Sequence, residues 1–437
     1  MNKYRLGDIA KVEVSGIDKK TKEGEKLVRL CNFVDVYYNW AITKNMYEGL
    51  MQASASDSDI ETFSLQRGQV AITKDSETRD DIGVATYIAD DFDDVVLGYH
   101  CALITPKDDV PEEQRIYGKY LNAILHTKYA QKYFSNNATG SGQRYTLSKE
   151  AIEDMPIYLP LPQEQKRIGD YLSDIDNKIE LNNLINAELE AIAKQIYDYW
   201  FVQFDFPNNE GNPYKSSGGK MVWNEAIKKE VPEGWEVDYL SHKIGGKKSG
   251  DWGQDDPSDL NSLKVNCIRG ADFSDPTNAP VRFISNKNEK RLLEEDDIII
   301  EISGGSPIQA TGRSVFVSKG LAENYNGNLT CSNFCQAITF ENKYMASFFY
   351  FTWNLLYDNG NMFNYEGKTS GIKNLQIDTL LENLWYFPPQ ELLIEFSTIY
   401  SDLLLMRDKN IKANNELHSL RNSVTPLLVY GQVTIKE

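Results

Sequence analysis

Two long amphipathic patterns stand out in the order of apolar and polar residues along the chain. The first begins near Gln163 and the second near Gln390, and in both the apolar residues recur mostly three or four positions apart. This spacing places side chains on one face of an α-helix. The first set is Ile168, Leu172, Ile175, Ile179, Ile185, Leu189, Ile192 and Ile196. The second set is Phe396, Ile399, Leu403, Met406, Leu417, Leu420, Val424 and Leu427. We expect two long helices that pack on each other.

The starts of these predicted helices carry suitable residues. Pro162 and Pro389 fit the first helical position, and Glu164 and Glu391 favour the positive end of the helix dipole. A helix of about 35 residues is about 52 Å long at 1.5 Å per residue, which exceeds an ordinary packing element of a compact domain. We therefore favour a spacer role over the alternative, in which both are core helices of two duplicated domains.

The second half of the chain repeats the order of the first half at an offset of about 228 residues, a weak internal repeat. Turn and strand patterns recur in the same sequence, and each half closes with a glycine loop, an apolar strand and a proline. The matching pairs are 65–73 with 293–301, 82–88 with 311–317, 100–104 with 335–339, and 140–165 with 369–391.

Residues 206–220, which follow the first predicted helix, are rich in Gly, Pro, Ser and Asn and are typical of a linker. The expected order is therefore a globular domain at 1–160, a long helix at 161–206, a linker with a second globular domain at 207–389, and a second long helix at 390–437. The predicted fold class is α+β: two mixed α/β domains separated by two long antiparallel, coiled-coil-like helices, with a pseudo-twofold internal repeat.

The charge and the hydropathy of the sequence limit the kinds of function that we expect. The net charge of −18 is unfavourable for binding DNA phosphate, and the acidic residues are spread over the whole chain. Any DNA-binding surface must therefore be local. The sequence has no apolar leader at its start and no stretch of about 18 apolar residues, so we expect a cytoplasmic protein without a membrane span.

Motifs of enzyme chemistry are incomplete in this sequence. Gly367 begins a Gly-Lys-Thr run, but a phosphate-binding loop needs a glycine five positions earlier, where Met362 stands. The Asn-Pro-Tyr run at 212–214 lacks the second proline of an amino-methyltransferase motif and is expected to form a turn. Of the five cysteines, only Cys331 and Cys335 are close in sequence, and no second ligand pair for zinc is found. We expect no active site, no cofactor and no metal.

The duplicated order resembles the specificity subunits of type I restriction-modification systems, and the resemblance covers nearly the whole chain. The residues that carry it are the Leu-Gly-Asp-Ile turn at 6–9, the Gly-x-x-Arg/Lys loops, the Pro-Gln-Glu helix starts, and the junction at 218–224 and 231–237. The second half begins differently, because residues 240–250 depart from the pattern at 6–9.

The resemblance implies two target recognition domains held apart by paired helices. It also implies double-stranded DNA, two methyltransferase subunits and motor-nuclease subunits as partners, in a complex where this chain is not catalytic. Two alternatives stay open: a specificity subunit of a methyltransferase without a nuclease partner, and an acidic scaffold or DNA mimic that binds restriction subunits.

For DNA contact we select loops that combine glycine with cationic or amide side chains, because glycine permits close backbone approach while the side chains reach phosphates or bases. The candidates in the first half are Lys74, Arg79, Ser141, Gln143, Arg144 and Tyr145. The candidates in the second half are Lys243, Lys247, Lys248, Arg313, Lys368 and Lys373.

Overall fold

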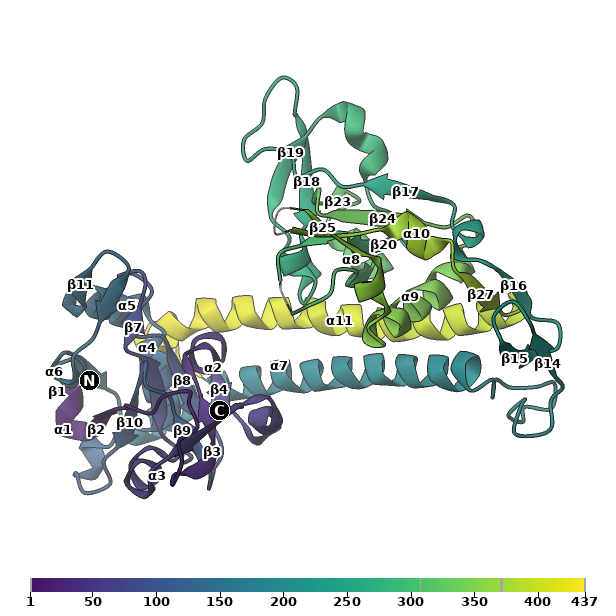
Figure 1. Cartoon of the computed structure of the whole chain (residues 1–437). Coiled ribbons are helices and arrows are strands. Elements are labelled where there is room, and N and C mark those ends of the chain that lie inside the picture. The colour runs from purple at the N-terminus through teal and green to yellow at the C-terminus, as the bar shows by residue number, and fades with distance from the viewer. Residues whose placement is uncertain (1, 307, 370–371, 436–437) are drawn as a thin grey trace. The chain divides into compact units, whose positions relative to one another are not determined.

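The computed structural model describes residues 2–306, 308–369 and 372–435, with the side chains of 368 and 369 left undescribed. The chain forms two compact units, of which the first comprises Met1–Leu181 and Ala413–Glu437 and the second Asn182–Lys412. The long helices α7 (Pro162–Tyr197) and α11 (Gln390–Val429) contribute residues to both units (Figure 1). Among the described residues, no helix is both long and apolar enough to cross a bilayer.

Within the described residues, the first unit contains three sheets of three or more strands and one strand pair. Its central sheet has the order β2-β10-β6-β8-β4 and is antiparallel except where β4 pairs with β8. The strands of this sheet are β2 (Ala10–Val14), β4 (Ala41–Ile42), β6 (Val70–Thr73), β8 (Ala85–Ile88) and β10 (Cys101–Pro106). A second sheet is formed by β5 (Met51–Ala55), β3 (Lys26–Cys31) and β9 (Val95–Leu97), and β1 (Asn2–Arg5) pairs with β13 (Pro156–Leu159).

The third sheet of the first unit is small, with the order β11-β12-β7. Its strands are β7 (Asp75–Ser76), β11 (Thr139–Ser141) and β12 (Arg144–Thr146). The helices of the unit, apart from the long ones, are α1 (Leu6–Ile9), α2 (Phe33–Tyr38), α3 (Asp57–Phe63), α4 (Gly118–Leu125), α5 (Lys128–Asn137) and α6 (Lys149–Glu153).

The second unit repeats this topology. The sheet β17-β24-β20-β22 corresponds to β2-β10-β6-β8, and β19-β18-β23 corresponds to β5-β3-β9, including one parallel pair in each. The small sheet β21-β26-β25 corresponds to β7-β12-β11, and the pair β16-β27 to β1-β13. The repeat inferred from sequence is therefore a duplication of the sheet topology of the first unit.

The strands of the second unit are β14 (Met221–Asn224), β15 (Lys229–Pro232), β16 (Glu236–Tyr239), β17 (Gly246–Ser249), β18 (Leu263–Ile268), β19 (Val281–Ile284), β20 (Ile298–Glu301), β21 (Ser303–Gly304), β22 (Ser314–Phe316), β23 (Leu329–Cys331), β24 (Cys335–Thr339), β25 (Glu366–Thr369), β26 (Ile372–Leu375) and β27 (Leu384–Phe387). Its short helices are α8 (Lys319–Asn324), α9 (Lys343–Asp358) and α10 (Ile377–Leu381). The 3-10 turn Leu240–Lys243 follows β16 as α1 follows β1, so the divergent opening of the second half keeps the same structure.

The long helices are antiparallel within each unit. In the second unit, the side-chain amide of Asn410 donates a hydrogen bond to Asn186 (2.9 Å), and Arg407 forms an ion pair with Glu190 (3.4 Å). A later residue of α7 thus contacts an earlier residue of α11, which shows that the two helices run in opposite directions. In the first unit, Arg421 of α11 pairs with Asp176 of α7. The expectation that these two helices pack on each other is confirmed.

The cores of both units include the long helices. In the first unit, Ile168, Leu172 and Leu428 join the buried cluster of the central sheet and α4. In the second unit, Tyr197 and Phe396 lie among the aromatic side chains of α9. The ends of the helices are therefore core elements of their units, because burying one apolar face against a sheet stabilises them far more than helix propensity does.

Part of the predicted apolar stripe is wrong. Ile185, Ile192, Met406, Leu420 and Leu427 are more than one-third exposed, although their spacing placed them on the packing face. A pattern of three and four residues does not distinguish one wide apolar face from two narrow ones.

The segment predicted as a linker is held in place by specific contacts. Phe206 stacks on Tyr214 and Trp235, with ring centroids 4.6 and 5.6 Å apart. Asp205 accepts hydrogen bonds from the backbone N–H and the hydroxyl of Ser216. These turns are an ordered part of the second unit.

Candidate nucleic-acid interface

The small sheet of the first unit brings together the candidates selected from the first half. Ser141 ends β11, Arg144 and Tyr145 begin β12, and Tyr145 is in register with Ser76 of β7. Lys74 immediately precedes β7, and Arg79 follows it, with its guanidinium 5.3 Å from the centre of the Tyr145 ring. Residues far apart in sequence thus form one surface.

The tip of the β11–β12 hairpin has the conformation that glycine permits. Gly140 and Gly142 have φ values of 122° and 71°. A Cβ atom at Gly140 would lie 2.0 Å from the carbonyl oxygen of Arg144, so a larger residue would break the hairpin. The side chains of Ser141, Gln143 and Arg144 are exposed at this tip, where a ligand can reach them.

Lys74 differs from Arg144 because an acidic partner holds its side chain. Its Nζ lies 2.7 Å from Asp75 Oδ2, and the Nδ1 of His100 lies 2.9 Å from the same oxygen. Hydrogen bonds from Lys74, Thr146 and His100 keep the pKa of Asp75 below its usual value, although burial of the carboxylate opposes this. Lys74 therefore serves mainly to neutralise Asp75 and to fix the His100 ring.

The corresponding small sheet of the second unit carries Lys368 and Lys373, which are paired in register. The side chain of Lys368 lies outside the described part of the structure. Lys373 is buried: its Nζ lies 3.2 Å from Glu366 Oε2 and donates to the carbonyl of Gln309. This position makes Lys373 a structural cation of the sheet.

Lys373→Ala is expected to lower the free energy of unfolding by about 3 kcal/mol, because it leaves the buried carboxylate of Glu366 without its cation. Urea unfolding of the full chain measures this effect. The double variant Lys373→Met, Glu366→Gln removes both charges and is expected to regain most of the loss. Normal stability of Lys373→Ala together with weaker DNA binding would instead assign Lys373 to the DNA surface.

The other candidates of the second half also have acidic partners. Lys243 pairs with Glu236 and Asp238, at 2.7 and 3.0 Å. Lys248 pairs with the buried Asp297 at 2.8 Å, and Lys247 with the exposed Asp378. Arg313 donates two hydrogen bonds to Glu301, each 2.8 Å long. Unlike the first-half candidates, these cations are dispersed over several elements, and intramolecular carboxylates compete with phosphate for them.

Sequence reasoning missed an exposed basic group in the second unit. Lys264 lies on β18, and Lys287 and Lys290 lie in the 3-10 turn that follows β19. All three are exposed, and none takes part in an ion pair with another described residue. The available signal was the run Asn-Lys-Asn-Glu-Lys-Arg at 286–291, which contains a single acid.

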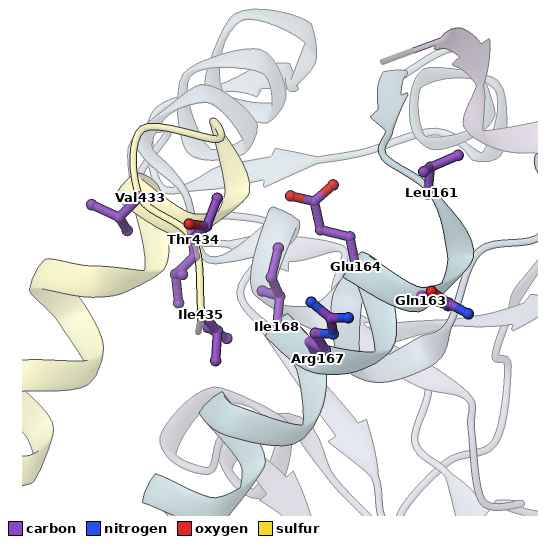
Figure 2. Close-up of a pocket in the computed structure, with 9 residues that line it drawn as sticks. Leu161, Gln163, Glu164, Arg167, Ile168, Val433, Thr434 and Ile435 are labelled. Atoms are coloured by element: carbon purple, nitrogen blue, oxygen red, sulfur yellow. The ribbon is translucent and has the colours of Figure 1, made fainter. Parts of the chain in front are cut away.

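A cavity of about 230 Å³ in the first unit is separate from these candidates. It lies between the first turns of α7 and the segment after α11, and Figure 2 shows Glu164, Arg167 and Ile168 on the helix opposite Val433 and Ile435. Its lining contains none of the residues selected for DNA contact.

Groups for metal or thiol chemistry are not assembled in the described residues. No group of three His, Cys, Asp or Glu side chains there is placed to hold a metal ion. All five cysteines are buried and unpaired, and burial raises the pKa of Cys101 to about 12, which disfavours a reactive thiolate.

Comparison with known proteins adds an independent line of observation. A family model described as the type I restriction modification DNA specificity domain matches residues 1–191. The type I restriction enzyme MjaIX specificity subunit of Methanocaldococcus jannaschii is 24% identical over 344 residues, which cover 76% of this chain and 72% of that protein. The HindI specificity subunit of Haemophilus influenzae is 28% identical over 131 residues, 30% of this chain and 28% of that protein.

A solved structure has the same fold over nearly the whole length. The crystal structure of a type I restriction-modification system S subunit from M. genitalium aligns with a TM-score of 0.53 and 14% sequence identity. The alignment covers 98% of this chain and 95% of that one.

Proposed function

We propose that the chain is a specificity subunit of a type I restriction-modification system, which reads a bipartite DNA target and assembles methyltransferase subunits through its long helices. The family-model match over residues 1–191 and the similarity to the MjaIX specificity subunit support this proposal. In this proposal residues 1–160 and 207–389 are the target recognition domains, and 161–206 and 390–437 are the helical segments. The reaction itself takes place on partner subunits in the cytoplasm, and this chain supplies no catalytic residue, cofactor or metal.

The observation that carries the proposal is the duplicated topology. Each unit has the same central sheet and the same small sheet beside it, and in the first unit that small sheet gathers exposed polar side chains at a hairpin tip. Two similar readers can contact two separate stretches of one duplex, as a split target requires. The cations are local, which is how a chain of net charge −18 can bind a polyanion.

For the proposed recognition domain at 1–160, the DNA contacts that we propose are Ser141, Gln143, Arg144 and Arg79, with Tyr145 and Lys74 supporting them. Arg144 has no acidic partner among the described residues, so its guanidinium is available for a phosphate or for the edge of a guanine. For the proposed recognition domain at 207–389, the contacts that we propose are Lys247 and the exposed cations Lys264, Lys287 and Lys290. Lys243, Lys248 and Arg313 are held in ion pairs and are proposed to stabilise the fold of that surface.

Docking of partner subunits is supported by apolar side chains on the outer faces of the helices. In the second unit, Leu184, Ile185 and Ile192 of α7 and Leu405 and Met406 of α11 are exposed. Clustered exposed apolar groups mark protein interaction surfaces. We propose that methyltransferase subunits, and through them motor-nuclease subunits, cover these faces.

Co-expression with a candidate methyltransferase subunit from the same source tests the function. We expect methylation at one bipartite motif, found by sequencing methylated DNA, and loss of that methylation when this chain is omitted. Binding of the methyltransferase without any sequence-specific methylation would favour the acidic scaffold. Adding the motor-nuclease subunit separates a restriction complex from a methyltransferase that works without one.

Arg144→Ala is expected to weaken binding of the assembled complex to its target by about 1–3 kcal/mol without lowering stability, because the side chain is exposed at a hairpin tip. Titration of target DNA into the complex, at two salt concentrations, measures it. A base contact relaxes the first half-site alone, whereas a phosphate contact weakens all sequences alike and reduces the salt dependence. Exposed Lys149, on α6 in the same unit and paired with Glu153, provides the matched control Lys149→Ala. Unchanged binding by Arg144→Ala would exclude this hairpin as a contact.

A further inference from the structure

The two units carry an aromatic residue at the same place beside their small sheets. His100 precedes the first residue of β10, and Phe334 precedes the first residue of β24. The carbonyl of His100 accepts a hydrogen bond from the N–H of Lys74 (2.9 Å), next to β7. The carbonyl of Phe334 accepts from Ile302 and Ser303 (2.8 and 3.1 Å), at the start of β21. The backbone therefore fixes each residue against its small sheet in the same way.

These positions expose aromatic surface. Phe334 is 54% exposed, and Tyr99, whose ring is in contact with that of His100, is 40% exposed. The hydrophobic effect favours burial of such rings. Because the backbone holds them in water in the free protein, covering them with a ligand is favourable. Both exposed rings lie in the turn that leads into β10 or β24, where the backbone is hydrogen-bonded to the edge of the small sheet.

Charged and polar groups surround each aromatic position. In the first unit, the His100 ring bonds to Asp75, which in turn pairs with Lys74. In the second unit, the side-chain oxygen of Asn333 accepts a hydrogen bond from the backbone N–H of Trp252. The guanidinium of Arg282 lies 4.0 Å, and that of Arg269 5.7 Å, from the centre of the Trp252 ring. Aromatic rings with neighbouring cations suit nucleic acid, where bases offer flat apolar faces and methyl groups beside anionic phosphates.

Resting on the proposed function, we propose that the turn of Tyr99 and His100 in the first unit and the turn of Asn333 and Phe334 in the second are equivalent base-contacting segments. Each places one exposed aromatic ring, that of Tyr99 or of Phe334, against the bases of its own half-site. The duplication is the reason for treating them as a pair. An aromatic ring used only for packing within one unit would have no need to be exposed in the same turn of both units. DNA is preferred over a protein partner because both positions adjoin the sheets that carry the polar candidates.

The test uses the complex with methyltransferase subunits and a duplex that carries the motif it methylates. Tyr99→Ser and Phe334→Ser are each expected to weaken binding about tenfold, the size of one lost base contact. The effect should be specific to one half-site. On a duplex with the first half-site scrambled, Tyr99→Ser should cost nothing further while Phe334→Ser still weakens binding, and scrambling the second half-site should reverse this. The conservative variants Tyr99→Phe and Phe334→Tyr should retain binding.

Matched controls separate a base contact from general loss of apolar surface. Trp223→Ser removes a ring that is 53% exposed on the β14–β15 hairpin of the second unit, and Leu27→Ser removes an apolar side chain that is 75% exposed on β3 of the first. Both should bind as the unaltered complex does. Unchanged binding by Tyr99→Ser and Phe334→Ser, or loss of subunit assembly in place of DNA affinity, overturns the inference. Absence of specific methylation by the unaltered complex is a different result, which rejects the proposed function.

Discussion

Arg421→Met is expected to destabilise the first unit by about 3 kcal/mol at neutral pH, because it leaves Asp176 buried without its cation. The guanidinium lies 2.5 Å from the Asp176 carboxylate and 4.4 Å from the centre of the Trp40 ring, which stacks in turn on His126. Arg421 thus joins α7 and α11 to the Trp40 segment within this unit. Urea unfolding of the full chain gives the size of the loss, and hydrogen exchange along 162–181 locates it.

The pH dependence of this variant has a definite sign. Burial raises the pKa of Asp176 to about 6, although Arg421 opposes the shift. Since this exceeds the ordinary value of 3.8, the stability linked to Asp176 is complete below pH 4 and is lost as the pH rises through about 6. Without Arg421 the folded-state pKa is higher still. The difference between variant and unaltered protein should therefore be largest above neutral pH and shrink on acidification.

Lys119→Met provides the control for this pair. Lys119 of α4 pairs with Asp170 of α7, the helix that also carries Asp176, at 2.7 Å, but the pair is largely exposed to solvent. Its removal should cost less than about 1 kcal/mol and show no comparable recovery in acid. An equal loss in both variants, or a loss independent of pH, would contradict the assignment of Arg421 to a buried pair.

Inserting seven residues into each long helix, near Asn183 and near Ile411, is expected to lengthen the unspecified spacer of the DNA target by about three base pairs. Seven residues add two turns and nearly preserve the packing face, and each helix grows by about 10 Å at 1.5 Å per residue. Duplex DNA rises about 3.4 Å per base pair. The hydrogen bond between Asn186 and Asn410 places the two insertion points at almost the same level of the helix pair.

Sequencing of methylated DNA from cells that carry the double insertion with partner subunits measures the spacer. Both half-site sequences should be unchanged. A single insertion is the control: it shifts Arg407 past Glu190 and should impair assembly. Full activity with the original spacer would show that the helices do not set the distance, and altered half-sites would show that they help to read bases.

The long helices and the duplication could be predicted from sequence because both depend on local spacing and order. Helical periodicity located α7 and α11, and repeated turn and strand patterns located the matching strands. The face assignment failed at residues such as Ile192 and Met406, since a helix with apolar groups on two sides gives nearly the same pattern. The linker at 206–220 was predicted from composition, which carries no information about the stacking of Phe206 on Tyr214.

The candidate site was predictable where the signal was local. Gly140 and Gly142 indicate the hairpin tip, and Arg144 follows closely in the sequence. The environment of the lysines was not predictable. Lys248 is neutralised by Asp297, and Lys373 is buried against Glu366 across a strand pair. Whether a cation faces a ligand or a carboxylate is decided by tertiary contacts that leave no mark on the local sequence.

The discontinuous make-up of the first unit has a consequence for biosynthesis. Its core cluster contains Ile168 and Leu172 together with Leu428 and Val429, yet the ribosome must make the entire second unit between these two sets. At a synthesis rate of about 5–20 residues per second, that interval lasts tens of seconds. During this time the apolar side of the first half of α7 is without Leu428 and Val429, which cover it in the folded protein. The second unit, built from continuous chain, can fold first. A nascent chain stalled before Ala413 would expose the apolar face of the first half of α7 to solvent, where it is prone to aggregate. We therefore expect folding of this protein to depend on chaperones until its last segment leaves the ribosome.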